Sequence, residues 1–185
     1  MNRRFLAAIR VAAVLFVGVL LQTTVGADLR IKGVAPDLML LLAVCGGLAG
    51  GPEYGAMVGF AAGLLTDVFL TDTPVGLAAL TFCLVGFVVG SLRASVIPEG
   101  WALTPLIAVL ATAGGVVLFV VVGDVVGQSQ LTATGSHWLI RVAIVESVFA
   151  GVLSVPVARL VDWAATGSLG AEQLGKTGGD GEAQW

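Results

Sequence analysis

Apolar and polar residues follow one another in long blocks along this chain. Six apolar runs are separated by short segments that carry charges, Gly or Pro. A helix needs about 20 mostly apolar residues to cross the hydrocarbon core of a bilayer. The pattern therefore predicts an all-α integral membrane protein, a six-helix transmembrane bundle with spans at about 5–25, 36–50, 54–70, 75–92, 101–123 and 138–161.

Helix-start and helix-stop signals set several of these limits. Pro36-Asp37 precedes the second run, and proline at a first turn beside a carboxylate favours a helix start. Gly50-Gly51-Pro52-Glu53 separates the second and third runs by a tight turn. The second and third spans are therefore expected to form a hairpin.

The end of the chain changes in composition. Residues 164–185 are rich in Gly, Ala and polar side chains, with too few apolar residues to build a packed core. We expect one membrane domain over 1–163 and a disordered cytoplasmic tail over 164–185.

Composition narrows the class further. The chain is 57% hydrophobic and 11% charged, with a mean hydropathy of +1.01, which excludes a water-soluble globule. The formal net charge of −3 leaves no basic patch for phosphates, so nucleic acid is excluded as a partner.

Basic residues indicate the topology. Six spans place both termini on one side of the membrane. Six basic residues fall on that side, namely Arg3, Arg4, Arg10, Arg93, Arg159 and Lys176, and three fall opposite, namely Arg30, Lys32 and Arg141. The positive-inside rule then places both termini in the cytoplasm of a plasma membrane, with Arg93 as a cytoplasmic anchor.

A four-residue glycine spacing is the most specific pattern in the chain. Gly55, Gly59 and Gly63 recur at this interval, and Asp67 occupies the next step. Positions four apart lie on one slowly winding stripe of a helix, and small residues allow close approach between membrane helices. The stripe packs either against the chain's own helices or against a partner, and Gly86 and Gly90 repeat the spacing.

Several charged residues are candidates for function. Glu146 lies deep in the last run, where a carboxylate either binds a ligand, a proton or a partner, or is satisfied internally. Pro36, Asp37, Asp124 and Arg141 are expected at the outer rim. Such a rim could serve as a set of helix caps, as a docking site, or as a small-molecule pocket.

Catalytic signatures are not found. The sequence contains no glycine-rich phosphate loop, nucleophile elbow or His-carboxylate cluster, so we predict no enzyme, no metal and no cofactor. Cys45 and Cys83 lie within apolar runs and are expected to behave as small hydrophobic residues. His137 is expected at the membrane interface.

The order and spacing of these motifs resemble the bacterial rod shape-determining protein MreD family. The resemblance rests on Pro36-Asp37 before its Leu-rich run, on the glycine stripe ending at Asp67, on Pro74-x-Gly76-Leu, and on Gly86-x-x-x-Gly90-x-Leu-Arg93. It implies a non-enzymatic scaffold of the rod complex, or elongasome, in cell shape and lateral peptidoglycan synthesis. It also implies a fold similar to the substrate-binding component of energy-coupling-factor transporters.

The same resemblance implies partners. These are the bitopic protein MreC and, indirectly, MreB, a SEDS glycosyltransferase and a class B penicillin-binding protein. Two alternatives remain open on the sequence. One is the substrate-binding component of a vitamin-type transporter, and the other is a proton-coupled carrier that uses Glu146.

Overall fold

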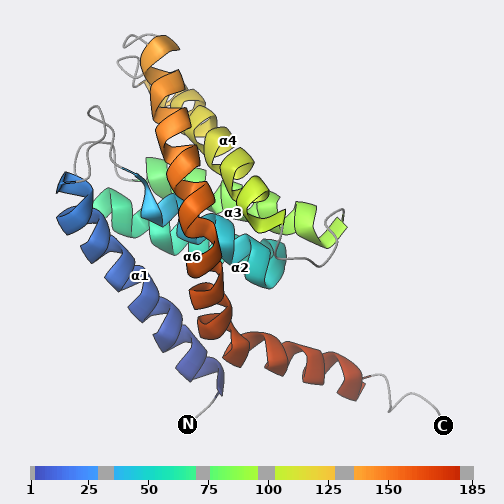
Figure 1. Cartoon of the computed structure of the whole chain (residues 1–185). Coiled ribbons are helices and arrows are strands. Elements are labelled where there is room, and N and C mark those ends of the chain that lie inside the picture. The colour runs from blue at the N-terminus through green and yellow to red at the C-terminus, as the bar shows by residue number, and fades with distance from the viewer. Residues whose placement is uncertain (1–2, 29–35, 70–75, 96–102, 128–135, 180–185) are drawn as a thin grey trace.

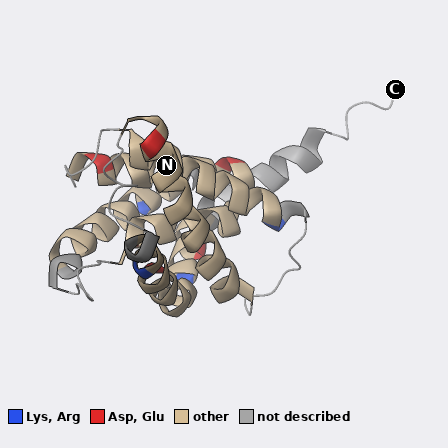
Figure 2. Cartoon of the chain, turned by 90° about the horizontal axis from the view of Figure 1, so that it is seen from above, with Lys and Arg blue, Asp and Glu red and all other residues tan. Residues whose placement is uncertain are grey.

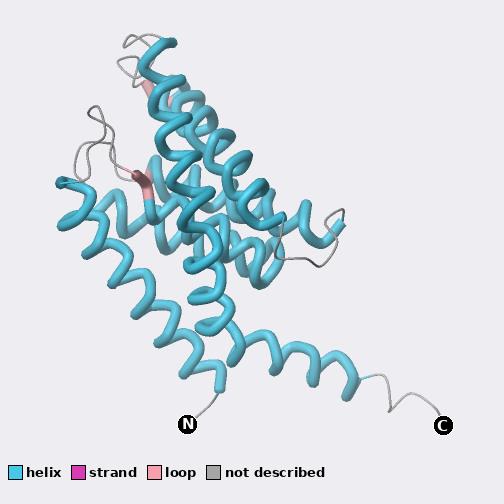
Figure 3. The backbone as a smooth tube through the Cα atoms, in the orientation of Figure 1, coloured by secondary structure: helices cyan, strands magenta, loops and turns pink. Residues whose placement is uncertain are grey.

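The computed structural model describes residues 3–28, 36–69, 76–95, 103–127 and 136–179 of the chain. Within them the backbone is helical throughout, apart from short connecting turns (Figure 3). The helices are α1 (Arg3–Asp28), α2 (Leu38–Phe69), α3 (Leu77–Ser95), α4 (Thr104–Val125) and α6 (Ser136–Gly179) (Figure 1).

Four of these helices contain a segment that is long and apolar enough to cross a membrane. The segments are Phe5–Thr24, Leu38–Phe69, Thr104–Val125 and Leu139–Ala165, while Leu77–Arg93 of α3 is a shorter apolar helix. Charged residues are sparse along the described ribbon (Figure 2). The protein is therefore a multi-pass, all-α membrane protein.

The structure has five helices among the described residues, so the expected count of six spans is not supported. The spans expected at 36–50 and 54–70 correspond to α2, Leu38–Phe69, which has non-helical torsion angles only at Gly51 (φ 81°, ψ −169°). A Cβ added at Gly46 would lie 2.9 Å from the Cβ of Val58. In a straight helix these two residues would be about 18 Å apart, so α2 folds back on itself at Gly51.

The first arm of α2, residues 38–50, forms the centre of the fold. Its side chains from Met39 to Cys45 are at most 5% exposed. At 1.5 Å per residue this arm is about 20 Å long, shorter than the hydrocarbon core of about 30 Å. The arm is enclosed by protein, since α1, α4 and α6 all contact α2 and α3 packs closely against it.

The outer surface of the bundle is apolar. Each of the five helices exposes large hydrophobic side chains, for example Phe16 on α1, Met57 on α2, Phe87 on α3, Leu110 on α4 and Val152 on α6. Because polar groups cannot be left unpaired in hydrocarbon, this surface is suited to lipid.

The chain's last helix is longer than expected. Disorder was predicted after residue 163, but α6 continues to Gly179. Residues 157–179 contain no proline, and Ala, Leu, Glu, Gln and Lys in that stretch are good helix formers. The expectations for Arg30, Lys32, Pro74 and the tail after Gly179 concern positions outside the described residues.

The N-terminal end of α1 and the C-terminal part of α6 lie at the same end of the molecule (Figure 1). The guanidinium of Arg10 stacks over the ring of Trp163, 4.9 Å from its centroid. This cation–π contact stabilises the packing of α1 against α6.

Candidate functional site

The glycine stripe of α2 lies against α3. A Cβ added at Gly55, Gly59 or Gly63 would come closer than 3.0 Å to backbone atoms of Gly86, Phe82 and Ala78, respectively. Gly86 and Gly90 on α3 have the same relation to Gly55 and Gly51. The five glycines therefore hold two backbones in direct contact, and this face is occupied within the chain.

Asp67 caps the helix that follows it. Its side chain is 1% exposed and accepts hydrogen bonds from the backbone N–H groups of Gly76 (2.8 Å), Ala78 (3.1 Å) and Ala79 (3.0 Å). The first N–H groups of a helix have no partner within the helix. The Asp67 carboxylate, near the end of α2, thus provides acceptors for N–H groups at the start of α3.

Asp37 caps its own helix. Its Oδ1 accepts hydrogen bonds from the N–H groups of Met39 (2.9 Å) and Leu40 (3.0 Å), the usual pattern of a side-chain N-cap. Gln22 of α1 completes the arrangement, because its Oε1 accepts the N–H of Leu38 at 2.7 Å and its Nε2 donates to Asp37 Oδ1 at 3.4 Å. The start of α2 is thereby tied to α1.

Glu146 and Asp37 line one cavity. The cavity has a volume of about 160 Å³, and its other lining side chains are apolar, among them Leu40, Phe82 and Phe119. Glu146 projects from α6, and Asp37 stands at the start of α2. The structure thus brings two of the predicted site residues together, and two ionised carboxylates in such an apolar space would repel each other.

The remaining predicted site residues do not join this cavity. Pro36 is buried and lines a different groove, between α1 and α6. Asp124 is exposed near the C-terminal end of α4, and Arg141 is exposed near the start of α6. Arg93 is partly exposed in the last turn of α3, where a cation favours the negative end of the helix dipole.

Both cysteines are free thiols. Cys45 is buried within the first arm of α2, with its Sγ 4.0 Å from the carbonyl oxygen of Ser154 on α6. Among the described residues there is no group of three or more His, Cys, Asp or Glu that could hold a metal ion. The side chain of His137 lies outside the described positions.

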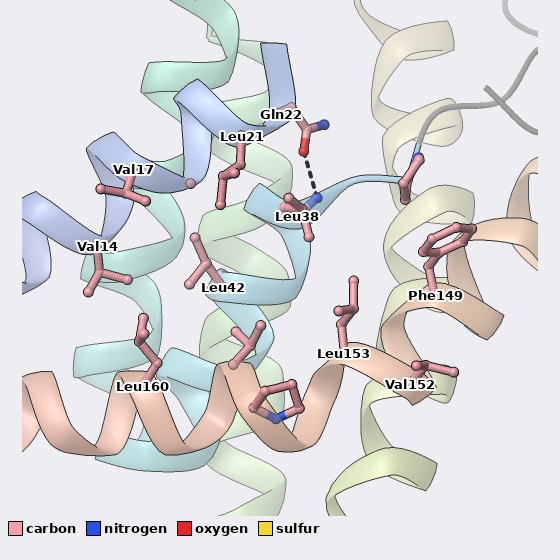
Figure 4. A pocket seen from close by; sticks show the side chains of 14 residues that line it. Val14, Val17, Leu21, Gln22, Leu38, Leu42, Phe149, Val152, Leu153 and Leu160 are labelled. Atoms are coloured by element: carbon pink, nitrogen blue, oxygen red, sulfur yellow. Dashed lines mark hydrogen bonds between the residues drawn. The ribbon is translucent and has the colours of Figure 1, made fainter. Parts of the chain in front are cut away.

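A groove lies between α1 and α6, with a volume of about 490 Å³ (Figure 4). We call it the α1–α6 groove. Its walls include Val14, Val17 and Leu21 from α1 and Val152, Leu153 and Leu160 from α6. Leu38 and Leu42 of α2 also line it.

Sequence reasoning missed this groove and the role of Gln22. Gln22 is the one amide in the first apolar run, and such a side chain is the signal that could have indicated a buried hydrogen-bond partner. The groove depends on the angle between two helices far apart in the sequence. No local pattern encodes that angle.

The comparisons with known proteins agree with the sequence motifs. A family model described as rod shape-determining protein MreD matches residues 2–163. No curated protein and no solved structure matches the chain. The expected likeness to the substrate-binding component of energy-coupling-factor transporters, and with it the transporter alternative, gains no support from these comparisons.

Proposed function

Because the chain belongs to the MreD family of rod shape-determining proteins, we propose that it is a non-enzymatic membrane scaffold of the rod complex. In this role it holds the bitopic protein MreC in the plasma membrane. Through MreC it acts indirectly with MreB, a SEDS glycosyltransferase and a class B penicillin-binding protein in lateral peptidoglycan synthesis. Both termini are cytoplasmic in this proposal.

The hydrogen bonds of the polar side chains support a scaffold role. Asp37, Asp67 and Gln22 satisfy the ends of helices, and helix caps need no substrate. A scaffold in the membrane binds its partners through apolar helix faces and small residues, because lipid provides no hydrophobic drive for association. A docking face should therefore be an apolar face that the bundle itself leaves uncovered.

One face of α4 has these properties. Leu110, Val117 and Val121 are 64%, 61% and 54% exposed, and Gly114 is exposed on the same stripe. A Cβ added at Gly114 would meet nothing within 4 Å. We refer to Leu110, Gly114, Val117 and Val121 as the α4 face and propose that the transmembrane helix of MreC packs on it, with Gly114 at the point of closest approach.

The experiment is co-purification of tagged protein with co-expressed MreC in mild detergent. We expect Gly114→Leu to reduce recovered MreC by about tenfold, since a bulky residue at a close helix contact costs on the order of 1–3 kcal/mol. Gly59→Leu is unsuitable as a probe, because its side chain would collide with the α3 backbone and unfold the bundle.

Val88→Leu on α3 is the matched control, because Val88 is 51% exposed and lies on another helix. Thermal unfolding of each variant separates loss of binding from loss of fold. Undiminished MreC recovery with Gly114→Leu would exclude the α4 face. Failure of the wild-type protein to recover MreC would count against the proposed scaffold role itself.

A further inference from the structure

The α1–α6 groove is apolar along almost its whole length. Gln22 is its single polar lining residue, and the amide of Gln22 is already hydrogen-bonded to Leu38 and Asp37. Water is not held in a hollow that lacks two to four polar partners. The walls belong to segments of α1 and α6 that are long enough to span the membrane, so hydrocarbon is the available filling.

The groove runs along the helices that form it. Its wall on α6 extends from Phe149 to Leu160, which corresponds to about 16 Å along the helix. A lipid acyl chain can lie along a groove of this length, and its headgroup then needs a charged partner at one end of the groove.

Basic residues stand at one end of the groove. Arg10 precedes Val14 by four residues and Val17 by seven, so it lies on the wall-forming stripe of α1. Arg159 follows Val152 by seven residues and precedes Trp163 by four, which places it on the corresponding stripe of α6. The contact between Arg10 and Trp163 brings these two stripes together at this end.

The opposite end of the groove carries different chemistry. There Gln22 and Pro36 line the groove beside Asp37, whose carboxylate accepts backbone hydrogen bonds. At the other end, the exposed carboxylate of Asp162 accompanies Arg10 and Arg159, so that end has two positive charges and one negative charge among the described residues. A negative headgroup would be repelled at the Asp37 end and attracted at the end with the two arginines.

We propose that the α1–α6 groove binds one anionic phospholipid from the bilayer. An acyl chain lies between α1 and α6, and the phosphate is held by Arg10 and Arg159. A guanidinium stacked on an indole ring keeps its N–H edges for hydrogen bonding, and its planar fork matches two phosphate oxygens. The lipid would fill the gap between the first and last helices and hold them at a fixed angle.

Native mass spectrometry of the full chain in detergent tests this proposal. Delipidated protein is titrated with phosphatidylglycerol and with phosphatidylcholine of the same chain composition. We expect one tightly held phosphatidylglycerol, bound about tenfold more tightly than phosphatidylcholine. Arg159→Gln, which removes one of the two guanidinium groups, should weaken phosphatidylglycerol binding about tenfold, because hydrogen bonds to charged groups contribute roughly 1.5–3 kcal/mol.

A second variant tests the groove by steric bulk. Val152 is 72% exposed at the groove wall, so Val152→Trp can fill the hollow without entering the core. The lipid should be lost from this variant and retained in Val88→Trp, whose exposed side chain lies on α3 outside the groove. Equal binding of the two lipids, or retention of the lipid in Val152→Trp, would overturn the proposal. So would loss of co-purified MreC from Val152→Trp with lipid binding unchanged, since a helix would then occupy the groove.

Discussion

At the scale of single residues, two carboxylates of this protein complete the starts of helices. Asp37 caps the helix it begins, whereas Asp67 reaches forward from the end of α2 to cap α3. In an apolar environment an unpaired backbone N–H costs several kcal/mol. A single carboxylate that accepts three such groups is therefore a large local contribution to stability.

Replacement of Asp67 tests this contribution. Asp67→Ala should lower the free energy of unfolding by about 2–4 kcal/mol, because three buried donors lose their acceptor. Asp67→Asn keeps one oxygen and should lose less. The measurement is unfolding in detergent followed by tryptophan fluorescence. Asp162→Ala, at an exposed position on α6, is the control, and an equal loss in that variant would contradict the capping role.

Sequence reasoning at this scale identified the residues but left their roles open. A carboxylate in an apolar run is expected to have a partner, so Asp37, Asp67 and Glu146 could be singled out. The partner of Asp67 is a set of backbone N–H groups nine to twelve residues away. Every residue except proline has a backbone N–H, so the sequence does not show which of these groups a carboxylate will accept. Helix capping by Asp67 could therefore not be distinguished from ligand binding on the sequence alone.

At the scale of elements, the fold is organised around the hairpin of α2. Its two arms meet at Gly51, which adopts φ 81° and ψ −169°. That region of torsion space is accessible almost only to glycine. Pro52 follows at once and suits the first turn of the second arm, where its missing N–H would have had no partner.

Substitution of Gly51 by alanine isolates the backbone effect. A Cβ added at Gly51 would meet nothing within 4 Å, so any loss comes from the torsion angles. We expect Gly51→Ala to lower the free energy of unfolding by about 1–3 kcal/mol. Gly114→Ala, also with open space around the added Cβ but in a regular helix, should be neutral or slightly stabilising. Equal stability of the two variants would show that the turn tolerates an L-residue.

Element limits followed from local signals where these were strong. The Gly-Pro pair between the two arms of α2 and the proline before Asp37 are such signals, and the arms occupy nearly the ranges expected for the second and third spans. Local signals failed at the end of α6, because weak hydrophobicity was taken as absence of a helix. Helix propensity and burial are separate properties, and a helix can continue beyond the apolar region.

At the scale of the whole molecule, the first and last helices come together at the end that carries both termini. Arg10 and Trp163 make the contact, and Ala7 and Ala165 are buried in the same part of the bundle. The family match over residues 2–163 covers the whole bundle. The contact between α1 and α6 therefore joins the two ends of the segment that the family model matches.

Reporter fusions test the proposed orientation. Green fluorescent protein folds in the cytoplasm, and alkaline phosphatase is active only after export. We expect fusions at both termini to be fluorescent and inactive as phosphatases, because Arg3, Arg4 and Lys176 accompany these ends. Phosphatase activity at either terminus would contradict the orientation. A fusion between residues 128 and 135 is the control, with the opposite pattern expected.

Unequal helix lengths give the molecule a graded hydrophobic thickness. The apolar part of α3, Leu77–Arg93, is about 25 Å long at 1.5 Å per residue, whereas α4, with 22 residues, reaches about 33 Å. Where both helices stand along the membrane normal, a bilayer core of about 30 Å thins beside α3 and needs no thinning beside α4. Elastic deformation would then draw short-spanned neighbours to the α3 side and long-spanned neighbours to the α4 side. Bilayer deformation would in this way select which membrane proteins lie on each side of this protein before any specific contact forms.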